Sequence, residues 1–430
     1  MSEADRRLLL IAHAFPPAGG AGVQRPAKFA RYLCEMGWSV TVLAAEPSGA
    51  APRDESLLAE IPDAVSVLRI PFERRARPAP ARWGVPGLDR LRHEFWLARR
   101  GPDVEWAWCR QVLRAASGGR LGANPDVIVA TGDPFSSFVL AGRLSRKSGA
   151  PYVLDFRDPW CHGGGARGSS GIARELRWER DAVGGAARCV FATEGMRGLY
   201  AGVYPSEAAK FEAIENGVDL EEKARAADVE VNRREFEIVY TGSLSGLKDP
   251  GAFLDALVLA RERSTEFRKA ARFIHAGQDR LGETGEPLEV QLRSRGLEEC
   301  CRRLGYVAHD RAVRLQRAAG ALVLILARGE YIVCGKSYEY LASGRPVLAM
   351  VPPEGEAARI LRRSGSTVIA APDGPEDTAS KLLALFDRWR TGEGVCTGTS
   401  MVPREYTRRY QAEQMARVLE AAVTGHRAQT

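Results

Sequence analysis

The sequence predicts an α/β protein built from two doubly wound, Rossmann-like domains. Its 430 residues exceed what one hydrophobic core usually organises, so two domains are expected. Along most of the chain, short apolar runs alternate with longer stretches of helical periodicity. A glycine-rich loop, Gly19 to Gly22, separates the first apolar run from the first helical stretch, as is typical of phosphate-binding βα units.

The first apolar run, Leu8 to Ala12, predicts a buried strand, and residues 39–43 predict a second one. Between them, residues 23–36 place apolar side chains on one helical face, and Gly37 ends that helix. A helix that joins two neighbouring parallel strands forms a βαβ unit.

Further strands are predicted in two series. The first series continues at residues 65–69, 127–130, 152–155 and 189–192; the second runs through 237–241, 272–276, 321–326, 346–350 and 367–370, with helices at 250–262, 313–319 and 337–342.

These series predict an N-terminal domain over 1–216, a linker over 217–236 and a C-terminal domain over 237–402. Residues 403–430 are predicted to form a helix that packs back towards the N-terminal domain. The two domains are expected to face each other across a cleft, with ligands at the carboxyl ends of the strands. Residues 71–120 form an insertion rich in Arg and Trp, whose tryptophans either shape the acceptor side of that cleft or belong to the core: Trp83, Trp96, Trp106 and Trp108.

Composition narrows the functional classes. Apolar residues make up 45% and charged residues 27% of the chain, which is typical of a globular protein. The net charge of +7 suits an acidic ligand or an anionic membrane surface, but no zinc-finger, basic-zipper or RNA-binding pattern accompanies it, so no nucleic-acid partner is predicted. Peripheral contact with a membrane surface stays a hypothesis.

The location predicted from the sequence is the cytoplasm. The eight cysteines include no CxxC pair and do not resemble a disulfide framework or a zinc site. The apolar run at Leu8 to Ala12 is too short for a signal peptide, and the longest other run, residues 318–327, is about half a membrane span.

Two loops in the second half contain residues that could bind phosphate. After the strand at 237–241, Gly242 and Ser243 open a small-residue loop that ends at Lys248, which can reach a diphosphate as a point charge or lie on the surface before a helix. Further on, Gly335, Lys336 and Ser337 begin a short helix whose N-terminus can face phosphate.

Glu339 lies about one turn into that second helix. Its carboxylate can accept two hydrogen bonds from vicinal ribose hydroxyls, or it can stabilise the first turn of its own helix. In the first half, Asp155, Arg157 and Asp158 lie at the end of the strand predicted at 152–155 and can order an acceptor or a transferred sugar. The alternative for these three residues is an internal ion pair that supports the strand end.

Taken together, the order of these features resembles the retaining glycosyltransferases of the GT-B fold, specifically the family 4-like group. The resemblance runs from Leu8 to about Leu385, and its pieces are the Phe-Pro-Pro and Gly-Gly loop at 15–20, Asp-Phe-Arg-Asp-Pro-Trp at 155–160, Glu-Asn-Gly-Val-Asp at 215–219, Tyr-Thr-Gly at 240–242 with Lys248, Gly-Tyr-Val at 305–307, and Tyr-Glu-Tyr-Leu-Ala-Ser-Gly-Arg-Pro-Val at 338–347.

The resemblance implies a role for each matching residue. Glu339 corresponds to the acid that holds the donor ribose, and Lys248 to the base on the donor diphosphate. Gly19 and Gly20 correspond to the loop against donor phosphate and acceptor. Tyr306 and Val307 lie where the family frames the nucleobase.

Two departures concern the sugar and the diphosphate. The family usually has two glutamates with seven residues between them; here Tyr331 occupies the first position and Glu330 precedes it. Where the family usually has an arginine after the glycine of the diphosphate loop, this chain has Ser243. The diphosphate would therefore depend on Lys248 and helix N-termini, or on an arginine from elsewhere.

The function expected is sugar transfer from a nucleoside diphosphate sugar to the hydroxyl of a natural product, a lipid-linked acceptor or a saccharide. The enzyme would be hexosyltransferase-like, of EC class 2.4, and the resemblance implies retention. The chain contains no Asp-x-Asp triplet, so no metal and no cofactor are predicted. Alternatives are a sugar-nucleotide epimerase or hydrolase of the same architecture, a binding protein without catalysis, and a nicotinamide oxidoreductase, which would lack its dinucleotide fingerprint.

Overall fold

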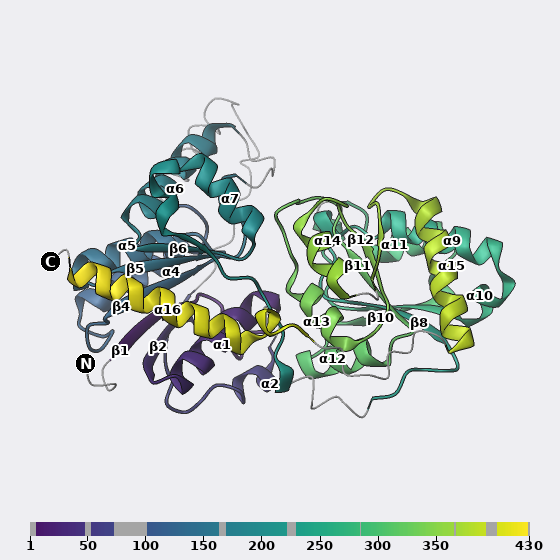
Figure 1. Cartoon of the computed structure of the whole chain (residues 1–430), viewed down its shortest axis with the longest axis horizontal. Coiled ribbons are helices and arrows are strands. Elements are labelled where there is room, and N and C mark those ends of the chain that lie inside the picture. Colours follow the sequence, from purple (N-terminus) through teal and green to yellow (C-terminus); the bar gives the residue numbers. More distant parts are fainter. Residues whose placement is uncertain are drawn as a thin grey trace, which may run out of the picture. The chain divides into compact units, whose positions relative to one another are not determined.

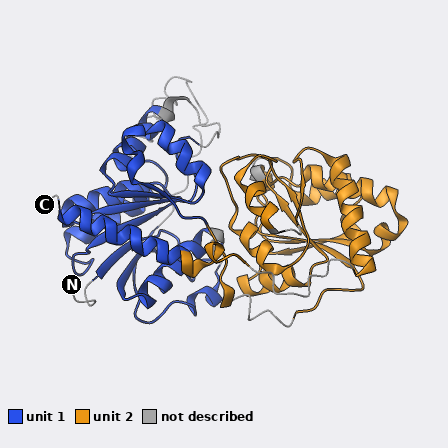
Figure 2. Cartoon of the chain, viewed as in Figure 1, with its two compact units in different colours: residues 1–215, 411–430 blue, residues 216–410 orange. Residues whose placement is uncertain are grey.

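The computed structural model describes residues 6–47, 53–72, 101–162, 169–221, 229–283, 285–364, 367–392 and 402–428. By their internal contacts these residues form two compact units. Unit 1 comprises Met1–Glu215 with Gln411–Thr430, and unit 2 comprises Asn216–Tyr410 (Figure 2). The contact boundaries therefore lie next to residue 216, before the composition-based linker, and within the last helix.

Unit 1 contains a parallel sheet of seven strands in the order β3-β2-β1-β4-β5-β6-β7 (Figure 1). Its strands are β1 (Arg6–Ile11), β2 (Trp38–Ala45), β3 (Ser66–Ile70), β4 (Val127–Gly132), β5 (Tyr152–Phe156), β6 (Arg188–Phe191) and β7 (Phe211–Ala213). The central strands are mostly apolar because helices cover both faces of the sheet. All six residues of β4, for example, are buried.

The helices of unit 1 are α1 (Ala21–Glu35), α2 (Glu55–Leu58), α4 (Trp106–Ser117), α5 (Ser136–Ser148), α6 (Ser169–Gly185), α7 (Glu194–Val203) and, from residue 411 on, α16 (Arg408–Arg427). The last helix returns to unit 1, where Met415 and Leu419 are completely buried in the core formed by β1, β2 and α1 (Figure 1). Burial of this apolar stripe is what holds the chain terminus on the unit.

Unit 2 contains a second parallel sheet, of six strands in the order β10-β9-β8-β11-β12-β13. The strands are β8 (Phe236–Thr241), β9 (Ala271–Ala276), β10 (Cys301–Gly305), β11 (Ala321–Ile325), β12 (Val347–Met350) and β13 (Thr367–Ala370). The helices are α9 (Gly251–Arg263), α10 (Thr265–Ala270), α11 (Leu288–Ser294), α12 (His309–Ala318), α13 (Gly335–Ser343), α14 (Glu356–Leu361) and α15 (Pro375–Thr391).

Both strand orders confirm the predicted doubly wound α/β class. In each sheet the chain reverses its direction of winding once, between β1 and β4 in unit 1 and between β8 and β11 in unit 2. Such a switch point opens a crevice at the carboxyl ends of the strands, because the flanking loops lead to opposite faces of the sheet.

Two strands escaped the sequence prediction. The three residues of β7 are too few to show a period, and β10 carries two exposed arginines, Arg302 and Arg303, at the edge of its sheet. An edge strand needs no continuous apolar run, so hydrophobicity does not reveal it. No helix among the described residues has the length and apolar character needed to cross a membrane.

Candidate functional site

The loop after β8 lies at the switch point of unit 2 and depends on two glycines. Gly242 has φ of 111°, a conformation that side chains other than glycine rarely adopt. Its amide donates to Ala276 O over 2.7 Å, which draws the loop against the end of β9. A Cβ on Gly277 would come within 2.0 Å of Gly242 O, so the approach requires glycine there as well. The hydroxyl of Tyr240 donates to Ser243 O over 3.2 Å and supports the loop from below.

Helix α13 begins at the same crevice, after β11. Gly335 is its first residue, and nothing lies within 4 Å of where a Cβ would be. The helix therefore presents its N-terminal amides and the positive end of its dipole without a covering side chain at Gly335. Gly344 ends the helix in the left-handed conformation with φ of 72°. The sequence prediction of a short glycine-bounded helix is confirmed.

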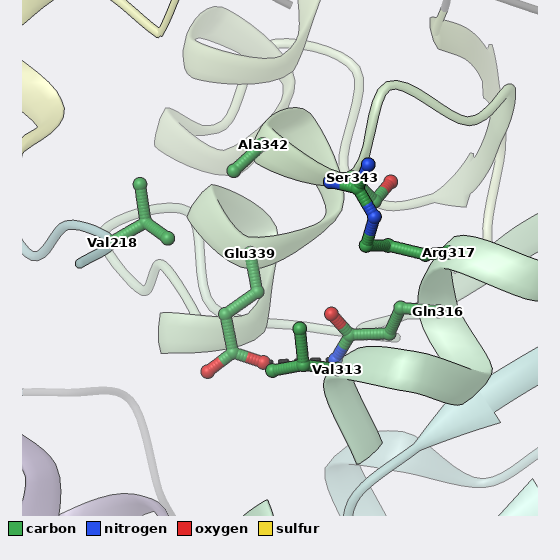
Figure 3. Close-up of a pocket in the computed structure, with 7 residues that line it drawn as sticks. All are labelled: Val218, Val313, Gln316, Arg317, Glu339, Ala342 and Ser343. Carbon is green, nitrogen blue, oxygen red and sulfur yellow. Dashed lines mark hydrogen bonds between the residues drawn. The ribbon is translucent and has the colours of Figure 1, made fainter. Parts of the chain in front are cut away.

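Glu339 occupies the middle of α13 and lines a small pocket (Figure 3). Its Oε2 accepts a hydrogen bond from Gln316 Nε2 over 2.9 Å, and the same nitrogen donates to Thr241 Oγ1 over 3.0 Å. The hydroxyl of Tyr340 contacts Thr241 as well, accepting a hydrogen bond from its amide over 3.0 Å. These contacts tie α12 and α13 to the end of β8 and hold the carboxylate in one orientation.

The remaining wall of the pocket comes from the start of unit 2 and from the facing surfaces of α12 and α13. Val218 is held in place by two backbone hydrogen bonds, to Tyr406 O over 2.9 Å and from Arg408 N over 3.0 Å. Figure 3 shows Glu339 extending towards Gln316 between the two helices, with Arg317 near Ser343 further along the pocket. The pocket combines apolar walls with a fixed carboxylate, as small-molecule sites commonly do.

The side chain of Lys336 lies against Gly242. Its Nζ lies 3.7 Å from the centroid of the Tyr240 ring, and a Cβ on Gly242 would come within 2.9 Å of it. Burial, and after that the positive charge of Lys248, lower the pKa of Lys336 to about 7. Lys248 itself is half-buried at the end of a short 3-10 turn, Gly246–Lys248. Two candidate cations therefore share this end of the sheet.

The structure thus brings together most of the candidates from unit 2. Gly242, Ser243, Lys248, Gly335, Lys336, Ser337 and Glu339 all belong to the loop after β8 or to the first half of α13.

Four further candidates of unit 2 lie on elements other than the Gly242 loop and α13. Glu330 is exposed in the turn after β11, where its backbone oxygen accepts a hydrogen bond from Glu356 N over 2.8 Å. Tyr331 follows it and is half-buried. Tyr306 and Val307 come after the edge strand β10, and Tyr306 is 37% exposed.

Asp155 in unit 1 belongs to a buried ion pair. It is completely buried at the end of β5, where Arg25 from α1 binds it at 2.8 Å and Thr131 Oγ1 donates to it over 2.9 Å. Arg25 also donates to Ile214 O, over 2.9 Å. Its carboxylate oxygens are enclosed in this way, which favours the alternative role of Asp155 in an internal ion pair that supports the strand end.

Arg157 connects the glycine-rich loop to the end of β4. Its guanidinium donates to Gly22 O over 2.5 Å and to Gly132 O over 2.6 Å, and it also donates to Asp133 O. Asp158 is exposed beside it. At the other end of the loop, Gly20 caps α1 with φ of 110°, next to Gly19. Arg157 therefore holds the C-terminal end of the Gly19–Gly22 segment, at Gly22.

The described tryptophans of the insertion belong to the core. Trp108 is completely buried and Trp106 nearly so, both on α4. Trp83 and Trp96 lie outside the described residues. Among the described residues, no group of three or more His, Cys, Asp or Glu side chains is placed to hold a metal ion.

Sequence reasoning missed Gln316 and Arg25, although each left a signal. Both are long polar residues on helices, and both are almost completely buried, at 1% and 2% exposed. A buried polar side chain needs partners, and here the partners are the two candidate carboxylates, Glu339 and Asp155.

Comparison with known proteins agrees with this architecture. Residues 19–217 match the family model described as a glycosyl transferase 4-like domain. A comparison with curated proteins finds no match.

Solved structures resemble nearly the whole chain at low sequence identity. Sucrose-phosphate synthase from Thermosynechococcus elongatus is 14% identical with a TM-score of 0.63, over 98% of this chain and 100% of that one. Anabaena HepE in complex with UDP is 15% identical with a TM-score of 0.62, over 97% and 100%. TarM is 9% identical with a TM-score of 0.65, again over 97% and 100%. Residues 19–217 are thus similar to a glycosyl transferase 4-like domain, and the chain as a whole has the GT-B fold that these solved structures share.

Proposed function

We propose that this protein is a glycosyltransferase that moves a sugar from a nucleoside diphosphate sugar to an acceptor hydroxyl. The observation that carries the proposal is the cluster at the switch point of unit 2. There the fixed carboxylate of Glu339, the N-terminus of α13 and two lysines lie around one glycine loop. Few ligand classes need a carboxylate for hydroxyls and positive charge for phosphate side by side, and a nucleoside diphosphate is one of them.

Each part of the donor has a matching group. The ribose hydroxyls would donate to Glu339, whose Oε1 is left for a ligand while Oε2 accepts from Gln316. The diphosphate would lie against the α13 N-terminus, the Gly242 loop, Lys248 and Lys336. We assign Tyr306 and Val307 to the nucleobase, as the resemblance implies. The Anabaena HepE structures contain UDP and UDP-glucose, which supports a nucleotide-sugar donor here.

The chemistry asked of these residues is electrostatic. When the bond between sugar and diphosphate breaks, negative charge grows on the leaving diphosphate, and fixed amides and ammonium groups stabilise it. We propose that the reaction proceeds with retention and without a metal ion, and that the donor's own phosphate accepts the proton of the acceptor hydroxyl. The acceptor is assigned to unit 1, on the side of the Gly19–Gly22 loop, and its class remains one of a natural product, a saccharide or a lipid-linked hydroxyl.

The first test is a thermal-shift screen with UDP, GDP, ADP, TDP and NAD, each with and without magnesium. A ligand at about a hundred times its Kd adds about 2.7 kcal/mol of stability, which raises the Tm visibly. Stabilisation by one nucleoside diphosphate, with or without magnesium, is the expected result and identifies the base. Stabilisation by NAD alone would overturn the proposal.

One solved structure similar to this chain points to a second candidate function. A putative UDP-N-acetylglucosamine 2-epimerase from Listeria monocytogenes is 13% identical with a TM-score of 0.54, over 99% of this chain. Incubating the protein with a nucleotide sugar of the base found in the thermal-shift screen, without an acceptor, distinguishes a transferase from an epimerase. Release of an epimerised sugar would favour the epimerase, and release of the unaltered sugar would favour a hydrolase. If the protein binds the donor but transfers its sugar to no acceptor in a panel, it would be a binding protein.

A further inference from the structure

Lys336 holds a buried ammonium group with no acceptor. Its Nζ is shielded from solvent and makes no hydrogen bond with any described residue. The face of the Tyr240 ring, 3.7 Å away, attracts a cation but accepts none of its three N–H donors in a conventional hydrogen bond. A buried charge without a partner is costly, and proteins usually pair it or leave it neutral. The surroundings of Nζ decide between these outcomes.

The groups that face Nζ do not supply a counter-ion. Lys248, on the 3-10 turn after β8, disfavours a second positive charge. Burial, and to a smaller extent the charge of Lys336, lower the pKa of His275 on β9, whose Nε2 is 3.1 Å from Gly242 O. Glu339 and Cys334 favour the charged form of Lys336 but less strongly than burial and Lys248 oppose it, and the Glu339 carboxylate is engaged by Gln316. Near neutral pH the group is therefore poised between its two protonation states.

The position of Nζ indicates which kind of ligand would pair with it. It lies beside Gly242, where the chain has no side chain, and on the first turn of α13, whose amides also favour an anion. Ser337, the next residue, adds a buried hydroxyl that has no hydrogen-bond partner among the described residues. Ser243 supplies no positive charge to this loop. An anion that enters here meets one ammonium that is already charged, Lys248, and one that becomes charged as the anion arrives.

We propose that Lys336 binds the donor diphosphate directly and that the site takes up one proton at Lys336 Nζ when a nucleoside diphosphate binds. This inference rests on the proposed function and deepens it. The proton comes from solvent and converts the amine to an ammonium, so that no covalent bond other than N–H forms. In the empty site Lys336 is neutral, so the two lysines do not repel each other. In the occupied site both are charged and stabilise the negative charge of the leaving diphosphate.

Isothermal titration calorimetry with UDP measures the proton directly. At a fixed pH, the observed enthalpy varies with the ionisation enthalpy of the buffer, and the slope is the number of protons taken up. At pH 8 we expect an uptake of about one proton, because Lys336 is then mostly neutral in the empty site and the phosphates of UDP are already ionised. At pH 6 we expect no uptake, because Lys336 is then already charged and the terminal phosphate of UDP, whose second pKa is about 6, releases a proton on binding.

Three variants distinguish proton uptake by Lys336 from effects of the neighbouring charged residue Lys248. Lys336→Arg keeps a permanent charge, so UDP should bind within about tenfold of the wild-type affinity with no proton uptake at pH 8. Lys336→Met should bind at least about tenfold more weakly, also without uptake. Lys248→Met is the matched control: it removes the neighbouring cation, weakens binding, and leaves Lys336 able to take up its proton, although less completely at pH 8.

The outcomes distinguish this inference from the function on which it rests. If UDP binds the wild type without proton uptake at pH 8, or if uptake persists in Lys336→Arg, the inference is wrong and the donor assignment stands. If neither UDP nor GDP, ADP or TDP binds, the proposed function fails and the inference with it. Uptake that disappears only in the Lys336 variants supports both.

Discussion

The side-chain amide of Gln316 donates a hydrogen bond to Glu339 over 2.9 Å and a second one to the hydroxyl of Thr241 over 3.0 Å. One buried nitrogen thereby connects α12, α13 and the carboxyl end of β8. Both of its hydrogens are used, so the carboxylate is held without being neutralised. A carboxylate fixed before the ligand arrives loses little side-chain entropy on binding.

The first prediction concerns this pair. Glu339→Ala should weaken binding of the nucleoside diphosphate by about 1.5–3 kcal/mol, because hydrogen bonds from the ribose to a charged acceptor are lost. Gln316→Leu should weaken it by about 1 kcal/mol through loss of positioning alone. Calorimetric titration measures both. In the double variant the Gln316 change should add almost nothing, and strictly additive losses would contradict the positioning role.

A second prediction tests the glycine at the loop after β8. Gly242→Ala should destabilise the protein by about 1–3 kcal/mol, because φ is 111° and the new Cβ would lie 2.9 Å from Lys336 Nζ. It should also weaken nucleotide binding by displacing Lys336. Urea denaturation measures the first effect and titration the second.

The control for that substitution is Gly198→Ala in α7, where nothing lies within 4 Å of the new Cβ. A helix-interior alanine there should stabilise by about 0.5–1 kcal/mol and leave nucleotide binding unchanged. Equal effects of the two substitutions would mean that the loop conformation at Gly242 is not required.

A third prediction separates structure from catalysis at Asp155. Because the Arg25–Asp155 pair is buried at 2.8 Å, Asp155→Ala leaves an uncompensated guanidinium and should lower the free energy of unfolding by about 3–5 kcal/mol. Adding Arg25→Met to Asp155→Ala should cost less than the two single losses together. Near-normal stability of Asp155→Ala combined with abolished sugar transfer would instead assign Asp155 to the chemistry.

The fourth prediction follows from the sign of the Lys336 shift. The pKa of Lys336 is about 7 in the folded protein, below its ordinary value of 10.5, so between these pH values the unfolded chain holds a proton that the folded one does not. The contribution of Lys336 to stability therefore rises with pH across this window. Without nucleotide, Lys336→Met should be more stable than the wild type at pH 7, and the difference should shrink towards pH 10.

Urea denaturation at pH 7, 8 and 9 measures that difference, because other titrating groups are common to both proteins. A stability gap independent of pH would mean that Lys336 is charged in the empty site. A variant that is more stable and yet binds nucleotide less tightly would show that the wild type sacrifices stability for function at this position.

The sequence by itself determined the doubly wound class, most strands, and the glycine-bounded loops at 242 and 335. These features follow from local rules: buried parallel strands need continuous apolar runs, and special backbone angles need glycine. It also determined which residues were candidates, since Glu339, Lys336 and Asp155 each follow a strand or open a helix. Local pattern failed at β10, whose exposed arginines lie on a sheet edge.

Only the tertiary structure decided what the candidates do. Glu339 and Asp155 are both acids on regular elements near a switch point, yet one faces a pocket and the other is enclosed by Arg25, 130 residues away in sequence. Likewise, Lys248 and Lys336 are both lysines beside glycine loops, and only the packing of α13 over Tyr240 leaves Lys336 buried without a partner. The energy of a charge depends on its burial and on the charges around it, and both are properties of residues brought together by folding, not of their order along the chain.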